Sequence, residues 1–214
     1  RFSPQAVALL GTEVLSQLQA MHGAGLAHGD LKPKNMMLAD GSASAVHVVD
    51  FGVCRPFRSG SMFAMPRATA PAVGTTRFCS VPAHSGERSP RSDVESLAYV
   101  LIYMATGSLP WQGRGTAGSK RERAAQLLEG KLEEELLQQH TREGLAACPA
   151  LAEVLLSMVK ACRTIDREAM PDYPAMQEAL RGVGSAAVEL DRPKGCAAPG
   201  AMQELDRAGA FVIA

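Results

Sequence analysis

The sequence has little that would direct the protein to a membrane or a secretory route. None of its apolar runs approaches the ~18–20 residues that a membrane-spanning helix needs. Residues 1–4 contain neither an initiator Met nor the start of a signal-peptide pattern. We therefore expect an intracellular protein, in the cytoplasm, the nucleus or both, of which these 214 residues are an internal piece.

An excess of charge of one sign and metal-binding cysteine patterns are also missing. The 22 basic and 22 acidic side chains cancel, so there is no reason to expect nucleic acid or a membrane surface as a partner. The five cysteines form no C-x-x-C pair, and no His stands at metal-ligand spacing. We interpret them as reduced thiols that pack as small hydrophobic side chains.

What is present is a largely apolar chain, 46% hydrophobic, with helical periodicity. Ser3 and Pro4 suit the N-cap and the first position of a helix that ends at Gly23. Further helices are expected over residues 93–104, 120–130, 131–140, 149–161 and 171–180, and the two between 120 and 140 look solvated. The expected fold is therefore mainly α.

The remaining segments are short strands and irregular stretches. Residues 36–38 and 46–49 are short apolar runs around the turn Asp40-Gly41-Ser42, which predicts a small β-hairpin. Residues 53–74 lack periodicity and are expected to form a long loop. After Arg181 the composition shifts to Gly, Ala, Pro and mixed charge, so residues 182–214 are interpreted as a tail of uncertain order.

Two acidic motifs stand on either side of the predicted hairpin. The first is the loop His28-Gly29-Asp30-Leu31-Lys32-Pro33-Lys34-Asn35, and the second is Asp50-Phe51-Gly52. The spacing D-x-K-x-x-N followed by D-F-G is typical of the phosphoryl-transfer half of a protein kinase active site.

The residue types suit that chemistry. A carboxylate such as Asp30 can receive the proton that a substrate hydroxyl loses, and Lys32 can neutralise charge on the phosphoryl group. Asn35 and Asp50 offer the hard oxygen ligands that Mg²⁺ prefers.

The chain resembles the C-terminal lobe of protein kinases, and more narrowly the casein kinase 1 family with its vaccinia-related relatives, over about residues 4–181. Gly29 stands where most kinases have Arg, as in the vaccinia-related branch. The other matching stretches are Gly74-Thr75-Thr76-Arg77-Phe78-Cys79-Ser80, Ser92-Asp93-Val94-Glu95-Ser96-Leu97 with Gly107-Ser108-Leu109-Pro110-Trp111-Gln112-Gly113, and Cys162-Arg163 with Pro171-Asp172-Tyr173.

This resemblance implies a serine/threonine protein kinase that uses ATP and Mg²⁺ on protein substrates. It implies Asp30 as catalytic base, Lys32 as the phosphate-facing lysine, and Asn35 and Asp50 as Mg²⁺ ligands. Thr75 would hydrogen-bond around Asp30 and Lys32.

The resemblance also implies supporting and substrate-binding residues. Asp93 would anchor the backbone of the catalytic loop, and His28 would pack that loop. Arg77, with Lys120 or Arg123, would form an anion pocket that favours substrates acidic or already phosphorylated upstream of the target.

The sequence departs from a complete kinase in one respect. A kinase needs a glycine-rich loop, a strand lysine and a partner glutamate, and the 27 residues before His28 contain none of them. The G-x-G-x-x-G at 113–118 follows Trp111-Gln112 rather than a strand, and we interpret it as a connector.

The expected domain is thus the C-lobe part of a kinase catalytic domain, residues 1–181, with small β-hairpins and without the N-terminal lobe. Two other hypotheses remain open. The chain is a kinase-fold scaffold that binds a partner on the lobe face where an N-lobe would dock, or it derives from a truncated gene model.

Overall fold

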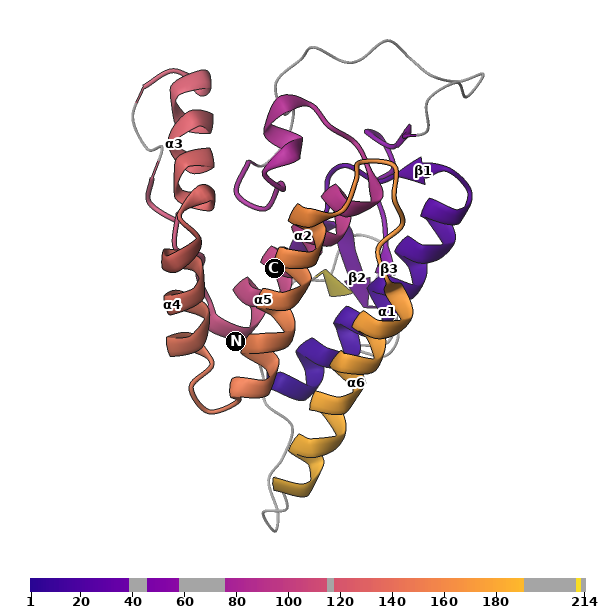
Figure 1. Cartoon of the computed structure of the whole chain (residues 1–214), viewed down its shortest axis with the longest axis vertical. Coiled ribbons are helices and arrows are strands. Elements are labelled where there is room, and N and C mark those ends of the chain that lie inside the picture. Colours follow the sequence, from indigo (N-terminus) through magenta and orange to yellow (C-terminus); the bar gives the residue numbers. More distant parts are fainter. Residues whose placement is uncertain (39–45, 58–75, 115–117, 191–210, 213–214) are drawn as a thin grey trace.

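The structure is a computed structural model that describes residues 1–38, 46–57, 76–114, 118–190 and 211–212, with only the backbone described for 184–190 and 211–212. Helices dominate these residues (Figure 1). They are α1 (Pro4–Gly23), α2 (Pro90–Thr106), α3 (Lys120–Leu132), α4 (Glu134–Gly144), α5 (Pro149–Thr164) and α6 (Tyr173–Leu190), with short 3₁₀ turns η1 (Pro33–Asn35) and η3 (Pro82–Ser85).

The strands are short and antiparallel. The predicted hairpin is confirmed as β2 (Met36–Leu38) paired with β3 (Val46–Val48), while its turn Asp40-Gly41-Ser42 lies outside the described residues. The far edge of β2 pairs with β5 (Phe211–Val212). A second pair joins β1 (Leu26–Ala27) to β4 (Arg55–Pro56), and so closes the chain around the loop that begins at His28.

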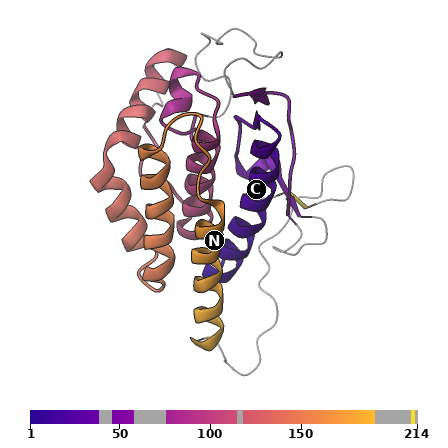
Figure 2. The same ribbon diagram turned by 45° about the vertical axis from the view of Figure 1, so that its right-hand side comes forward.

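The core is built around α2. This helix is buried on nearly all sides, and its residues from Leu97 to Ala105 are almost all apolar, as expected of a helix surrounded by protein. It packs between α1 and α5, and α6 covers α1 and α5 from one side (Figures 1 and 2). The contact at Gly11 is close, because a Cβ there would lie 2.9 Å from Cδ1 of Leu101 on α2 and 3.0 Å from Cδ1 of Leu180 on α6.

The helix starts follow the capping residues. Ser3 accepts a hydrogen bond from the backbone N–H of Ala6, which confirms the predicted start of α1. Ser89 accepts from the N–H of Ser92 and starts α2 at Pro90, earlier than the apolar run suggests. Ser119 and Glu122 form a capping box at the start of α3.

Further helix boundaries differ from prediction. The helix expected over 171–180 runs to Leu190, because Gly182 is followed by Val183, which is buried in the core and keeps the helix packed. The boundary expected after Gly130 falls at Glu133 instead. Lys131, expected on a solvated helix, is fully buried.

The loop and tail predictions are tested only in part. Arg55 and Pro56 form a strand, and residues 58–74 lie outside the described residues. Within the predicted tail, 182–190 are helical, 211–212 form a strand, and 191–210 lie outside the described residues. No helix in the described ranges has the length and hydropathy that crossing a bilayer requires.

Two adjacent leucines of α1 test the core. Leu10 is 0% exposed and Leu9 is 49% exposed. Leu10→Ala should lower the free energy of unfolding by about 2–5 kcal/mol, because it leaves a cavity in the core. Leu9→Ala should cost less than about 0.5 kcal/mol. Urea unfolding followed by circular dichroism measures both, and equal losses would contradict the packing of α1.

Candidate active site

The loop that begins at His28 is hydrogen-bonded to a buried carboxylate. Asp93, in the first turn of α2, is 2% exposed. Its Oδ2 accepts hydrogen bonds from the backbone N–H of His28 (2.6 Å) and from Nε2 of His22 (2.9 Å), and its Oδ1 accepts from the N–H of Gly29 (2.8 Å). Burying a carboxylate without donors is costly, and here the two backbone donors bind the loop to α2 while His22 adds a bond from α1.

His22 is the side chain in this arrangement that the sequence analysis missed. Its Nε2 donates to Asp93, so in the neutral ring Nδ1 is an acceptor, and the hydroxyl of Tyr173 donates to it. Burial, with the nearby Asp93, raises the pKa of Tyr173 above its usual value, so the hydroxyl keeps its proton. The motif Pro171-Asp172-Tyr173 marks Tyr173 in the sequence, but no sequence pattern indicates that Tyr173 contacts His22.

His28 forms contacts within the loop and to a neighbouring segment through its two ring nitrogens. Its ring is buried, its Nε2 contacts the carbonyl oxygen of Val49 at 3.1 Å, and its Nδ1 accepts from the N–H of Asp30 at 3.3 Å. The ring of Phe51 meets it edge-on with centroids 5.4 Å apart. His28 therefore connects the loop to the segment around Asp50.

Gly29 has a structural reason to be glycine. Its φ is 78°, in the left-handed region. A Cβ at this position would lie 2.5 Å from both Cδ and Nε of Arg88. The side chain of Arg88 thus occupies the space beside the loop that a larger residue at 29 would need.

Two of the predicted site residues, Lys32 and Asn35, converge on a third, Asp30. Nζ of Lys32 donates to Oδ2 of Asp30 at 2.5 Å. Nδ2 of Asn35 donates to the backbone carbonyl of Asp30 at 2.8 Å and contacts Oδ2 at 3.4 Å. Pro33 starts the 3₁₀ turn η1, which brings Asn35 back toward Asp30. Asn35 is buried, whereas Asp30 and Lys32 are half-buried and open to a ligand.

Asp50 is delivered beside this cluster by the hairpin. The N–H of Val49 donates to the carbonyl of Asn35 at 2.9 Å, so the residue before Asp50 is bonded to the end of η1. Asp50 has a φ of 67° and is exposed. The left-handed region is uncommon for residues other than glycine, although Asp tolerates it better than most.

The donor set at this place fits a magnesium ion. Asp50 offers an exposed carboxylate, and the amide oxygen of Asn35 is not used in the bonds to Asp30. Within the described ranges, no group of three or more His, Cys, Asp or Glu side chains could hold a metal. Two oxygen ligands match Mg²⁺, which completes its shell with water and phosphate oxygens.

The remaining predicted residues are those assigned to substrate binding and to the support of Asp30 and Lys32. Thr75 is outside the described residues. Arg77 lies in a turn and is exposed, and its backbone carbonyl accepts a hydrogen bond from Nε1 of Trp111 at 2.8 Å. Lys120 and Arg123 are exposed in the first turn of α3, and Lys131 at the other end of this helix contacts the turn around Arg77.

A second buried network supports this side of the site. Oε1 of Glu95, on α2, accepts hydrogen bonds from the hydroxyl of Tyr99 (2.5 Å), the N–H of Val81 (3.3 Å) and Nε of Arg163 (3.3 Å). Arg163 also donates to the backbone carbonyl of Lys131 at 2.7 Å. The network joins α2, α3 and α5 to the segment that follows Arg77.

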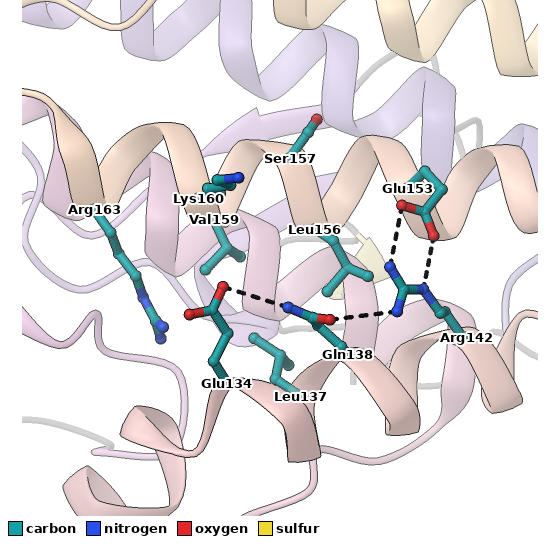
Figure 3. A pocket seen from close by; sticks show the side chains of 10 residues that line it. All are labelled: Glu134, Leu137, Gln138, Arg142, Glu153, Leu156, Ser157, Val159, Lys160 and Arg163. Atoms are coloured by element: carbon teal, nitrogen blue, oxygen red, sulfur yellow. Dashed lines mark hydrogen bonds and ion pairs between the residues drawn. The ribbon is translucent and has the colours of Figure 1, made fainter.

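A pocket of about 230 Å³ lies apart from the catalytic loop, between α4 and α5 (Figure 3). Arg142 bridges the two helices by bonding Glu153 at 2.8 Å. None of the predicted site residues lines this pocket. The candidate active site is therefore the open cluster around Asp30 and Asp50.

One comparison with known proteins bears on the whole arrangement. The family model for the protein kinase domain matches residues 1–173. The matched region contains the Asp30 loop, Asp50 and α2, and it ends at the first residue of α6.

The ring of His84 makes the free energy of unfolding depend on pH. Burial, and then the positive charge of Lys131, lowers its pKa from the usual 6.5 to about 4. The unfolded chain therefore binds a proton between these values that the folded chain does not, so stability falls as pH drops from about 6.5 to about 4. His84→Gln keeps an acceptor for Lys131 and should flatten that part of the curve in urea titrations. Parallel curves for the two proteins would contradict the buried, neutral state of His84.

Proposed function

Since this chain belongs to the protein kinase domain family, we propose that it carries the phosphoryl-transfer site of a serine/threonine kinase of the casein kinase 1 type. The observation that carries the proposal is the convergence of Lys32 and Asn35 on the carboxylate of Asp30. Such a kinase transfers the γ-phosphoryl group of ATP to the hydroxyl of a protein Ser or Thr.

Asp30 orients the substrate hydroxyl and receives its proton as the bond between that oxygen and the γ-phosphorus forms. The bond between the γ-phosphorus and the bridging oxygen breaks, and ADP leaves. Lys32 lies within reach of the same carboxylate and would contact the transferred phosphoryl group. Catalysis of this kind depends mainly on positioning and on neutralised charge, with little covalent work for the protein.

Asn35 and Asp50 would hold Mg²⁺ in this site. The ion supplies positive charge to the phosphate oxygens when it is bound. The hydrogen bond between Val49 and Asn35 keeps the two ligand-bearing segments together. Thr75, which precedes the described turn at Thr76, would hydrogen-bond around Asp30 and Lys32.

Arg77 would recognise the substrate, with Lys120 or Arg123 as a second cation. All three side chains are exposed and could reach an anionic group of a bound peptide. Exposed cations of this kind favour acidic or phosphorylated residues upstream of the target hydroxyl, because charge-assisted hydrogen bonds are the stronger ones.

A second candidate function is a scaffold in which the chain acts by binding rather than by catalysis. Phe51 is 55% exposed beside the catalytic loop, and Leu26 on β1 is also exposed. An ATP-binding lobe or another partner would cover these apolar side chains. Mg-ATP-dependent transfer by the 214-residue chain alone, at ordinary kinase rates, would rule this function out.

The substitution Asp30→Asn tests the catalytic role in the full-length protein. It keeps the size of the side chain but removes the proton acceptor, so phosphorylation of a casein-like substrate should fall at least ~100-fold. Asp172→Asn is the matched control, because Asp172 is exposed and its oxygen caps α6 through the N–H of Ala175, which Asn also permits. Unchanged transfer by the Asp30 variant, with normal activity of the control, would exclude Asp30 as the base.

A further inference from the structure

Lys131 is the least expected residue of the molecule. It lies near the end of α3, a helix that is otherwise largely exposed, yet its side chain is 0% exposed. A lysine is rarely buried completely, because removing an ammonium group from water is costly unless its three N–H groups find acceptors.

Nζ of Lys131 has a long contact with Sγ of Cys79 at 3.5 Å and three closer acceptors. These are the backbone carbonyls of Thr76 and Cys79, both at 2.6 Å, and Nε2 of His84 at 3.0 Å. These acceptors match the three donors of the ammonium group. Burial lowers the pKa of Lys131, and the low pKa of His84 keeps its ring neutral and able to accept.

Two aromatic rings complete the enclosure. Nζ of Lys131 lies 5.5 Å from the ring centroid of Trp111 and 5.8 Å from that of Tyr99, which are distances of cation–π attraction. Nε1 of Trp111 donates to the carbonyl of Arg77. The carbonyls of Thr76, Arg77 and Cys79 are thus all bonded by side chains from the protein interior.

Lys131 is itself held in place by a hydrogen bond to its backbone. The carbonyl of Lys131 accepts from Arg163, whose guanidinium also bonds Glu95. Because the carbonyls of the turn point inward, the side chain of Arg77 is left on the outside, where it is exposed.

We propose that Lys131 is a positioning residue for substrate recognition, which holds the Thr76–Cys79 turn from inside so that Arg77 meets an anionic group of the peptide. The inference rests on the proposed kinase function and adds to it a specificity determinant that never touches the substrate. The peptide it serves is one with a phosphoserine or carboxylates upstream of the target hydroxyl.

The kinetic test compares two peptides in the full-length protein, one with a phosphoserine upstream of the target Ser and one with Ala there. Lys131→Met should raise KM for the phosphorylated peptide ~10-fold, the worth of a charge-assisted contact, and leave KM for the neutral peptide and kcat for both unchanged. Lys160→Met, at an exposed lysine of α5, is the matched control and should change neither constant.

A double-mutant cycle separates positioning from general support. If Lys131 acts through Arg77, the variant with both Lys131→Met and Arg77→Ala should discriminate no less than Arg77→Ala alone. Additive losses, or equal losses on both peptides, would overturn the inference. A wild-type protein inactive on both peptides would instead refute the proposed function.

Amide exchange in the 214-residue chain gives a readout that needs no activity. Lys131→Met should speed exchange across residues 76–81, while α1 keeps its protection. If this variant fails to fold, Trp111→Phe keeps an aromatic ring but removes the bond to the carbonyl of Arg77 and some packing, and it should shift KM in the same direction by a smaller factor. Unchanged exchange in Lys131→Met, or unchanged KM in Trp111→Phe, would contradict the role.

Discussion

The site depends on the buried carboxylate of Asp93. It accepts hydrogen bonds from the N–H groups of His28 and Gly29 and from the ring of His22, so the start of the loop His28–Asn35 is bonded to α2, which is almost wholly buried. A loop of polar residues has few packing contacts of its own. The bonds to Asp93 replace them, and the geometry of Asp30, two residues on, follows from that attachment.

The same helix supports the other half of the site. Glu95, two residues after Asp93, lies in a network with Arg163 and Tyr99 that reaches the segment after Arg77. The loop His28–Asn35 is thus bonded to α2 through Asp93, and the segment after Arg77 is bonded to the same helix through Glu95. Because both attachments are buried, motion of either segment requires breaking hydrogen bonds that water cannot replace.

Much of the site could be predicted from local spacing. Lys32 follows Asp30 by two residues, and the 3₁₀ turn η1 brings Asn35 back toward Asp30. The hairpin of β2 and β3 then leads the chain to Asp50. Two features could not be predicted, because each joins residues far apart in the sequence. They are the contact between His22 and Tyr173 and the burial of Lys131 against Thr76. The end of α6 was missed since Gly182 disfavours a helix, while the packing of Val183 outweighs that preference.

The most direct test of this account is the exchange rate of the backbone amides of His28 and Gly29 in Asp93→Asn, measured by NMR in the 214-residue chain. The amide group of Asn places a donor where a carboxylate oxygen accepted, so at least one of the bonds is lost. The account predicts at least ~10-fold faster exchange at one or both of these amides, namely at the amide that faces the NH₂ group of the substituted side chain, with the amides of α5 unchanged. Exchange at wild-type rates would show that something other than Asp93 holds the loop.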